Sequence, residues 1–585
     1  MNTCDDAAVK RSLLLGARIR FSPSGASVRS QAIERIIEQN LASAEAAKGL
    51  TEQQLQNLVA LSGHFATLRT SDIKQGIDSL EKLRKLSVTL DGRTKRYQLS
   101  DDTRSVIARI ITDSEERTNI VIKDLFGSAT GGEKVYSRAF LRVLCTVFSK
   151  LSEVYVQVIT SRQPNKEFTE HRLLLAAIED TLRTERNLDK EAFRYGVNRF
   201  FRESTPQFDQ IKWNMAQNFY VAKALGIDTA TDILSSELFR EATLYCDTNV
   251  LIAGLTPGNR HHNSFLELTK ACQALGVNLK VSYATAEELK SVILGHAALL
   301  KKVYEKIPDE MQKEVKNFIL EGYLAERQKT PDLQLDDFIR EFMETIETLR
   351  DSFGIVREDD RWFDEGQDDV EVKKIAQELS KIYEEIRKRP KGKNASIHDA
   401  ILLMWVAREN ADNRASWIVT LDSTLAKWNA QTRKTKVITL DAFLQWMSPV
   451  TSDTANEGQL AEIFSAAIRY QLLPRDTFFR LSDFQVFADM GIETKLLPAE
   501  DVEACIRDIR QAVANADPSK AEDREKIGHI IQKYFADPGT KYKRTTEALQ
   551  TQSESIKNEL IKEKRLRDDA EKRVGELETG VFQRV

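Results

Sequence analysis

Four acidic residues lie next to short apolar segments in the second half of the chain: Asp247, Glu288, Asp399 and Asp422. Carboxylates held close together repel, so a cluster of them is stable chiefly when a divalent cation joins it. Oxygen ligands favour hard ions. If the fold brings these four residues together, their types predict a magnesium or manganese site.

The elements that would position these acids are short strands that alternate with helices between Glu241 and Ser448. The alternation predicts an α/β domain, a parallel sheet wrapped by helices, embedded in a mostly α-helical chain. A helical and acidic insertion at about residues 293–394 interrupts this domain. The expected strands are Thr243–Cys246, Asn278–Tyr283, Phe353–Arg357, Trp417–Leu421 and Lys436–Leu440.

The ends of the expected strands explain why the acids should meet. Ligands of open α/β sheets bind beyond the carboxyl ends of the strands. Asp247 and Asp422 each end a strand, and Glu288 lies in the first turns of the helix that follows another strand. Asp399 is expected to open the helix before the fourth strand. All four side chains can therefore face the same end of the sheet.

The motifs around these acids resemble the ordered acidic motifs of the PIN domain, a metal-dependent nuclease family, over about a third of the chain. They are CDTNVLI at 246–252, EL at 288–289, HDAIL at 398–402 and TLD at 420–422. The resemblance implies a PIN-like fold and hydrolysis of phosphodiester bonds with Mg²⁺ or Mn²⁺, most often in RNA. Such ions lower the pKa of water and neutralise charge on phosphoryl oxygens.

The resemblance also assigns roles to individual residues. It makes Asp247, Glu288, Asp399 and Asp422 the catalytic and metal-binding residues, and it makes Asn249 and Thr420 accessory residues that orient their neighbours. The sequence departs from the compact family pattern in one respect. Asp399 comes 111 positions after Glu288 because the helical insertion lies between them.

Each of these residues also has a structural alternative. Ser396 and Asp399 have the spacing of a capping box, and Asp247 and Asp422 could cap the helices that follow them. His398 could contact a phosphate, although a packed or exposed histidine at a helix start is the commoner case. Some members of the family keep the fold and lose metal binding, so an inactive PIN-like scaffold is the alternative to a nuclease.

A different pattern near the N-terminus predicts a second module. Two short helical patterns, Glu52–Leu61 and Ser71–Lys85, precede an expected hairpin that turns at Asp91 and Gly92. Helix, helix and hairpin is the order of a winged-helix module. The hairpin residues that could contact phosphate are Arg93, Lys95 and Arg96. The second helix is nearly charge-balanced, so docking of a protein remains an alternative to DNA binding.

The densest basic segment, residues 387–393, runs into the Asp399 helix. Its Lys391 and Lys393 are candidates for contact with nucleic acid, because a polyanion needs a positive path to an acidic site. Further basic residues that could flank this path are Arg260, Lys427, Arg433, Lys434 and Lys436. A solvated linker at the end of the insertion explains the segment equally well.

Composition excludes several classes of protein. The chain has 585 residues, a net charge of −4 and few Gly and Pro residues, which predicts several helix-rich globular units and no global attraction to nucleic acid. The five cysteines form no C-x-x-C pair, as expected of reduced thiols in the cytoplasm. No membrane span and no ATP-binding loop are expected.

These patterns divide the chain into five parts. We expect an N-terminal helical segment (1–50), the winged-helix-like module (51–102), a helical domain (103–242), the PIN-like domain (243–447) and a helical C-terminal region (448–585) that ends in a coiled coil at 541–585. The helical parts would regulate the nuclease by docking a protein partner or another copy of the chain. A DNA-binding regulatory protein is the alternative. A role in antiviral defence or as a toxin rests on architecture alone.

Overall fold

The computed structural model divides the chain into two compact units, residues 1–292 with 325–477, and residues 293–324 with 478–585. The expected coiled coil at 541–585 lies outside the described residues. The described residues are 28–43, 49–61, 68–127, 132–159, 170–185, 187–227, 239, 241–257, 262–315, 317–359, 366–387, 391–432, 434–448, 456–472, 479–489, 491–512 and 521–535.

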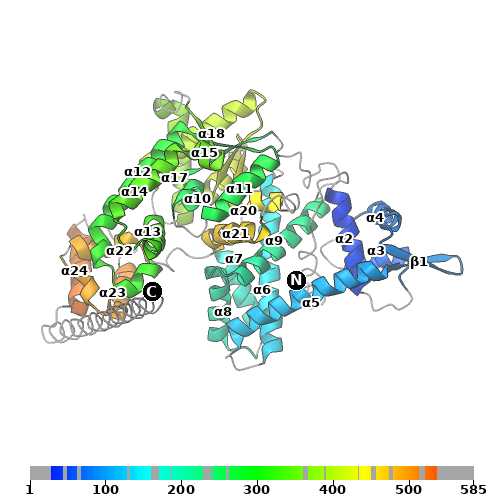
Figure 1. The fold of residues 1–585 in the computed structure, drawn as a ribbon. Coiled ribbons are helices and arrows are strands. Elements are labelled where there is room, and N and C mark those ends of the chain that lie inside the picture. The colour runs from blue at the N-terminus through cyan, green and yellow to red at the C-terminus, as the bar shows by residue number, and fades with distance from the viewer. Residues whose placement is uncertain are drawn as a thin grey trace, which may run out of the picture. The chain divides into compact units, whose positions relative to one another are not determined.

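The N-terminal module of the first unit has the predicted element order (Figure 1). Its helix α4 buries Ile73, Ile77 and Leu80, which recur at the spacing of one helical face. An antiparallel hairpin follows, and Gly92 takes the positive φ of its turn. Leu50 also forms an isolated antiparallel β-bridge with Tyr97 of the second hairpin strand. The elements are α2 (Val28–Ser43), α3 (Glu52–Leu61), α4 (Thr70–Lys82), β1 (Leu86–Asp91) and β2 (Thr94–Leu99).

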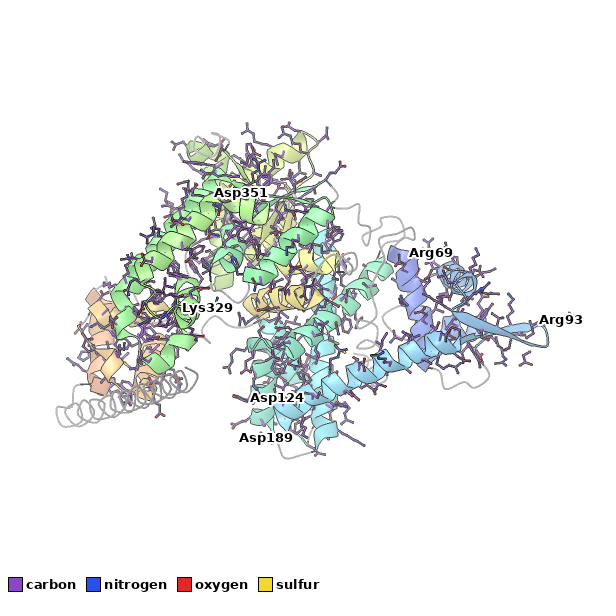
Figure 2. All side chains as sticks on the ribbon, in the orientation of Figure 1. Arg69, Arg93, Asp124, Asp189, Lys329 and Asp351 are labelled. Carbon is purple, nitrogen blue, oxygen red and sulfur yellow. The ribbon has the colours of Figure 1, made fainter. Side chains whose placement is uncertain are left out.

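A helical region connects this module to the sheet. Its core is aromatic: the Phe126 ring stacks on those of Tyr136 and Phe193. Asp189 lies at the start of α8 (Figure 2). It caps this helix by accepting hydrogen bonds from two backbone N–H groups of the first turn. The helices are α5 (Asp101–Phe126), α6 (Glu133–Ile159), α7 (Glu170–Thr184), α8 (Lys190–Arg202), α9 (Pro206–Ile227) and α21 (Glu457–Leu472).

Five parallel strands form the predicted sheet, in the order β5-β4-β3-β6-β7. All five expected strands are confirmed, although the segment at Phe353–Arg357 is shifted. Phe353 ends a helix and Gly354 has a positive φ, so the strand begins only at Val356. The strands are β3 (Thr243–Cys246), β4 (Asn278–Ser282), β5 (Val356–Glu358), β6 (Ser416–Thr420) and β7 (Val437–Thr439).

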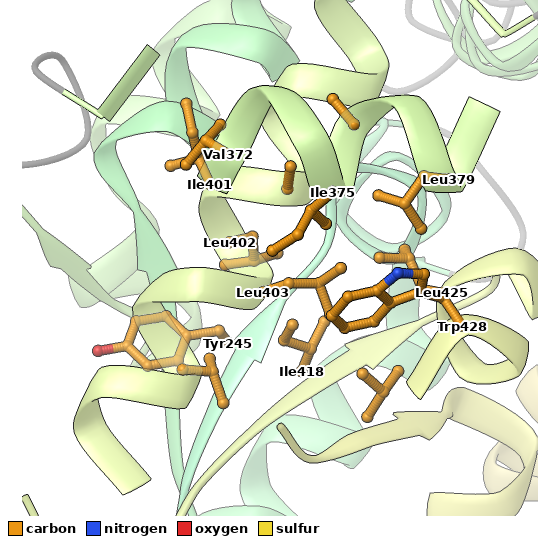
Figure 3. Packing of buried hydrophobic residues seen from close by; sticks show 14 of the residues in the cluster. Tyr245, Val372, Ile375, Leu379, Ile401, Leu402, Leu403, Ile418, Leu425 and Trp428 are labelled. Atoms are coloured by element: carbon orange, nitrogen blue, oxygen red, sulfur yellow. The ribbon is translucent and has the colours of Figure 1, made fainter. Parts of the chain in front are cut away.

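Helices cover both faces of this sheet, as expected for a parallel sheet. On one face, Tyr245 and Ile418 pack with apolar residues of α17, α18 and α19, including Leu402 and Trp428 (Figure 3). On the other face, Trp417 packs against Phe239, whose ring also meets Phe443 and Trp446 of α20. The helices around the sheet are α10 (Thr248–Leu255), α11 (His262–Ala274), α12 (Tyr283–Val303), α14 (Leu335–Glu347), α15 (Leu349–Phe353), α17 (Val370–Arg387), α18 (Lys393–Ala411), α19 (Ser423–Thr432) and α20 (Leu440–Met447).

The second unit is helical in its described part. Ion pairs join residues 302–309 to residues 489–495, as in Lys302 with Asp489 and Lys306 with Glu493. Its remaining described helices are α22 (Leu481–Asp489), α23 (Ala499–Ala512) and α24 (Ala521–Phe535), and α13 (Phe318–Lys329) crosses the boundary between the units. In the described part of the chain, no helix combines the length and the apolar character that a membrane crossing requires.

Candidate metal centre

The site lies where the order of the sheet reverses. β3 is the first strand of the sheet in the sequence and lies in its centre, with β4 on one side and β6 on the other. Such a switch point leaves a crevice beyond the carboxyl ends of the two strands. Asp247 follows β3 and Asp422 follows β6 by two residues. The sheet therefore carries both acids to the same end of two adjacent strands, as predicted.

Asp247 is buried and is held by neutral donors. Its Oδ1 accepts a hydrogen bond of 2.8 Å from the backbone N–H of Thr248, because Asp247 is the N-cap of α10. Its Oδ2 accepts from Asn249 Nδ2 at 2.7 Å and from Thr420 Oγ1 at 2.6 Å. Asp247 is thus also a helix cap, as the structural alternative predicts. The cap uses Oδ1 and leaves Oδ2 to contact Asn249 and Thr420.

Asn249 and Thr420 have the orienting contacts expected of them. Asn249 Oδ1 accepts a bond of 2.8 Å from the backbone N–H of Leu421, which ties α10 to the end of β6. Thr420 Oγ1 donates to Asp247 and accepts from the backbone N–H of Asp422 at 2.8 Å. The two residues therefore fix the rotamer of one acid and the backbone of the other.

Glu288 and His398 form the next contact of the site. Glu288 Oε2 lies 3.0 Å from His398 Nδ1 and accepts a hydrogen bond from Thr248 Oγ1. On the far side of the imidazole, Nε2 lies 3.1 Å from Thr285 Oγ1. Since Thr285 also bonds Ser282 at the end of β4, the ring is fixed between α18 and α12.

The position of Asp399 corrects the predicted helix start. α18 begins at Lys393, with Gly392 as its N-cap, so Asp399 lies in the second turn and does not open the helix. The capping box is wrong as well, because Ser396 Oγ pairs with Ser380 Oγ of α17 at 2.9 Å. Asp399 is nevertheless buried at the site, where its Oδ1 lies 3.4 Å from His398 Nδ1.

Lys391 lies inside the site, in contrast to the expected positive strip beside it. Its ammonium contacts the carboxylate of Asp399 and lies 3.1 Å from Asp422 Oδ2. It also lies 5.3 Å from the centre of the Tyr383 ring. Asp422 uses its other oxygen to cap α19, at 2.9 Å from the Thr424 backbone N–H. We call Lys391, Asp399 and Asp422 the lysine bridge.

The pKa of each acid in the site depends on whether a cation contacts its carboxylate. Burial alone would raise the pKa of Asp422, but Lys391 and the bond from Thr424 outweigh it and hold that pKa low. Burial likewise opposes ionisation of Glu288, but His398 lowers its pKa. Burial and the charge of Asp399 together raise the pKa of Asp247 to about 7. Asp247 is therefore the acid that lacks a cation of its own.

The two cations of the site show the opposite response. Burial alone would lower the pKa of His398, but its hydrogen bonds to Asp399 and Glu288 raise it to about 10. Burial would also lower the pKa of Lys391, and the charges of Asp399 and Asp422 raise it instead. The neighbouring carboxylates thus stabilise the charged forms of His398 and Lys391.

Three side chains of the site could share one metal ion. Ligand atoms of Asp247, Glu288 and His398 all lie within 4.8 Å of one another, and we call these residues the ligand triad. Two carboxylates and an imidazole fit Mn²⁺ or Mg²⁺, with the imidazole favouring Mn²⁺. The proton on His398 must leave before the ring can bind a metal. The residues present therefore fit the expected cofactor.

His398 is the residue that sequence reasoning undervalued. The sequence indicates a phosphate contact or a packed or exposed histidine at a helix start, whereas His398 is buried between two acids. A signal was present in the sequence, because His398 directly precedes Asp399 in a motif already singled out. A single histidine, however, carries no metal-ligand spacing of its own.

Several of the remaining basic candidates that the structure describes are exposed or pair with acidic residues outside the candidate site. Arg93 and Lys393 are exposed. Lys95 lies 3.6 Å from Glu81, and Arg96 donates to Asp91 at 3.0 Å. Of the further basic residues, Lys434 pairs with an acid of α17, while Arg260 and Arg433 lie outside the described residues.

Comparisons with known proteins give no relative for this chain. A scan against protein-family models found no match, and searches of curated proteins and of solved structures found none either. The fold and the site therefore rest on the sequence and the structure alone, and the resemblance to the PIN domain stays a prediction.

Proposed function

We propose that this chain is a metal-dependent nuclease of the PIN type that hydrolyses phosphodiester bonds of RNA, or of single-stranded DNA, in the cytoplasm. The observation that carries the proposal is the ligand triad, with Asp247 and His398 buried and Glu288 partly buried, at the switch point of a parallel sheet. Burial of several carboxylates without enough cations costs free energy, so such a cluster is typical of functional sites.

The positions of the motif residues support the same proposal. The four acids expected from the resemblance come from β3, α12, α18 and the end of β6, and a chain of contacts connects them. Asn249 and Thr420 contact Asp247 directly. Helix caps would explain Asp247 and Asp422 singly, but they explain neither the burial of Asp399 nor its contact with Lys391.

In this mechanism, Asp247, Glu288 and neutral His398 would hold a divalent ion, which would lower the pKa of a water and neutralise charge on the phosphoryl oxygens. Asn249 and Thr420 keep Asp247 in the rotamer that faces the crevice. Before the ion binds, His398 holds Glu288 in place through the 3.0 Å contact of its Nδ1. Lys391 supplies a fixed positive charge beside the acids, which favours approach of a phosphate.

The direct test is Mn²⁺-dependent cleavage of labelled single-stranded RNA and DNA by wild type and by Asp247→Asn. We expect the rate to fall on the order of 10²-fold or more, as for loss of a group that stabilises developing charge. Asp412→Asn is the matched control, because Asp412 is exposed at the end of α18. Equal cleavage by wild type and Asp247→Asn would contradict a nuclease and favour the inactive scaffold.

A second candidate function is DNA binding by the N-terminal module. The specific observation is Arg93, which is exposed in the turn between β1 and β2 (Figure 2). Binding of labelled duplex DNA should weaken when Arg93, Lys95 and Arg96 are all changed to Ala. Unchanged duplex binding would remove this function and leave docking of a protein as the role of the module.

A further inference from the structure

The site has two halves that differ in how their charge is balanced. In the ligand triad, Asp247 accepts only from neutral donors, the backbone N–H of Thr248 and the side chains of Asn249 and Thr420. In the lysine bridge, one ammonium contacts both Asp399 and Asp422. Among the described residues, Asp247 of the triad is thus hydrogen-bonded by no cation, whereas both carboxylates of the lysine bridge contact one.

The lysine bridge is built into the fold. The side chain of Lys391 is only 11% exposed, and the two carboxylates that it contacts are 7% and 14% exposed. Lys391 comes directly before Gly392, the N-cap of α18, so the helix start fixes its backbone. The Tyr383 ring of α17 adds a cation–π contact at 5.3 Å. A lysine placed in this way is part of the site and not a solvent-facing charge.

The carboxylates of the bridge have few free oxygens for a metal. Asp422 Oδ2 contacts Lys391, and its Oδ1 caps α19. Asp399 Oδ2 contacts Lys391, and its Oδ1 faces His398 Nδ1. A second ion between these two acids would have to displace the ammonium, which would then lie buried without its partners. Removal of one partner from a buried ion pair is strongly unfavourable.

The net charge of the centre is compatible with one ion. Four carboxylates and one lysine leave three negative charges when His398 is neutral, as a ligand must be. One divalent ion reduces this excess to a single negative charge, whereas two ions would reverse its sign. The ligand triad is also the one group of three metal-ligating side chains found among the residues that the structure describes.

We infer that the centre binds a single divalent ion at the ligand triad, and that Lys391 takes the place of a second metal ion between Asp399 and Asp422. The inference rests on the proposed function, since it describes the same site. It makes Lys391 a fixed cation of the centre, and it reassigns Asp399 and Asp422 from metal ligands to partners of that lysine.

The experiment counts Mn²⁺ ions bound per chain, from the electron paramagnetic resonance signal of free Mn²⁺ during titration of the full chain. Wild type should bind one ion, and Asp247→Asn should bind none over the same concentration range. Lys391→Met, which keeps the length of the side chain and removes its charge, should gain a second ion between the freed carboxylates. Lys393→Met is the matched control, because Lys393 is exposed two residues away, and it should bind one ion.

Two ions in wild type would overturn the inference, and so would one ion in a folded Lys391→Met chain. If Lys391→Met does not fold, Lys391→Arg keeps the charge and must still bind one ion, so two ions in that variant would also overturn the inference. Cleavage is scored separately. One bound ion without cleavage contradicts the nuclease and leaves the ion count intact, whereas cleavage with two bound ions contradicts only the count.

Discussion

The metal centre and the N-terminal hairpin both place acidic and basic residues next to each other, but they do so in different surroundings. In the centre, Lys391 and its two acids are nearly buried. At the hairpin, Lys95 of β2 pairs with Glu81 of α4, and these two side chains are 54% and 40% exposed. Water screens the second pair and not the first, so similar contacts should contribute very different free energies. Burial, more than the number of charges, therefore distinguishes the candidate metal centre from the charge pair at the hairpin.

The largest expected effect comes from breaking the buried pairs. Lys391→Ala leaves Asp399 and Asp422 buried without their cation, which should lower the free energy of unfolding by about 3 kcal/mol. Urea denaturation in the presence of EDTA measures this change. A loss below about 1 kcal/mol, the range of an exposed pair, would show that the buried pairs stabilise the fold no more than the exposed pair at the hairpin does.

Thr420→Val should have the next largest effect. Thr420 is fully buried and donates to Asp247 Oδ2 at 2.6 Å, so valine leaves that oxygen with one donor fewer. The free energy of unfolding should fall by about 2 kcal/mol, again by urea denaturation. Thr432→Val is the control, because the Thr432 hydroxyl only bonds the backbone of its own helix. Equal losses in the two variants would contradict a special role for Thr420.

The pH dependence of stability sharpens the comparison at Asp247. Its pKa is raised from 3.8 to about 7 by burial and by Asp399, so the native state binds a proton that the unfolded chain has released. Stability must then fall as pH rises, by about 1.4 kcal/mol between pH 6 and 8. Unfolding in EDTA should show this slope in wild type relative to Asp247→Asn. Parallel slopes would contradict the raised pKa.

The smallest effect is expected in the hairpin. Lys95→Ala removes an exposed pair with a separation of 3.6 Å, which should change the free energy of unfolding by about 0.5 kcal/mol or less. Thermal unfolding of this variant and of Lys391→Ala, measured in parallel, compares the stability lost with the exposed pair and with the buried pairs. A loss in Lys95→Ala that equals the loss in Lys391→Ala would show that burial does not decide the effect.

Much of the fold followed from local patterns. The five strands were predicted because short apolar runs alternate with helical patterns, and Asp247 and Asp422 were placed at the site because strand ends meet at one edge. The shifted start of β5 and the start of α18 were not predicted. Gly392 caps α18 without a side chain, whereas Ser396 carries the residue type that usually marks a cap.

The contacts within the site depended on distances that the sequence does not contain. Lys391 looked like one of several lysines in a basic segment, and only the packing of α18 beside the end of β6 brings it to Asp399 and Asp422. His398 reaches Glu288 across 110 positions of the chain. A residue type and a local spacing cannot predict a pairing that the folded core creates.

A crystal structure of the full chain grown with Mn²⁺, with the ion located by its anomalous scattering, would show directly whether one ion binds at the ligand triad. We expect one peak that contacts Asp247, Glu288 and His398, with Lys391 still between Asp399 and Asp422. A peak between Asp399 and Asp422 with Lys391 displaced, or no peak at Asp247, would contradict it.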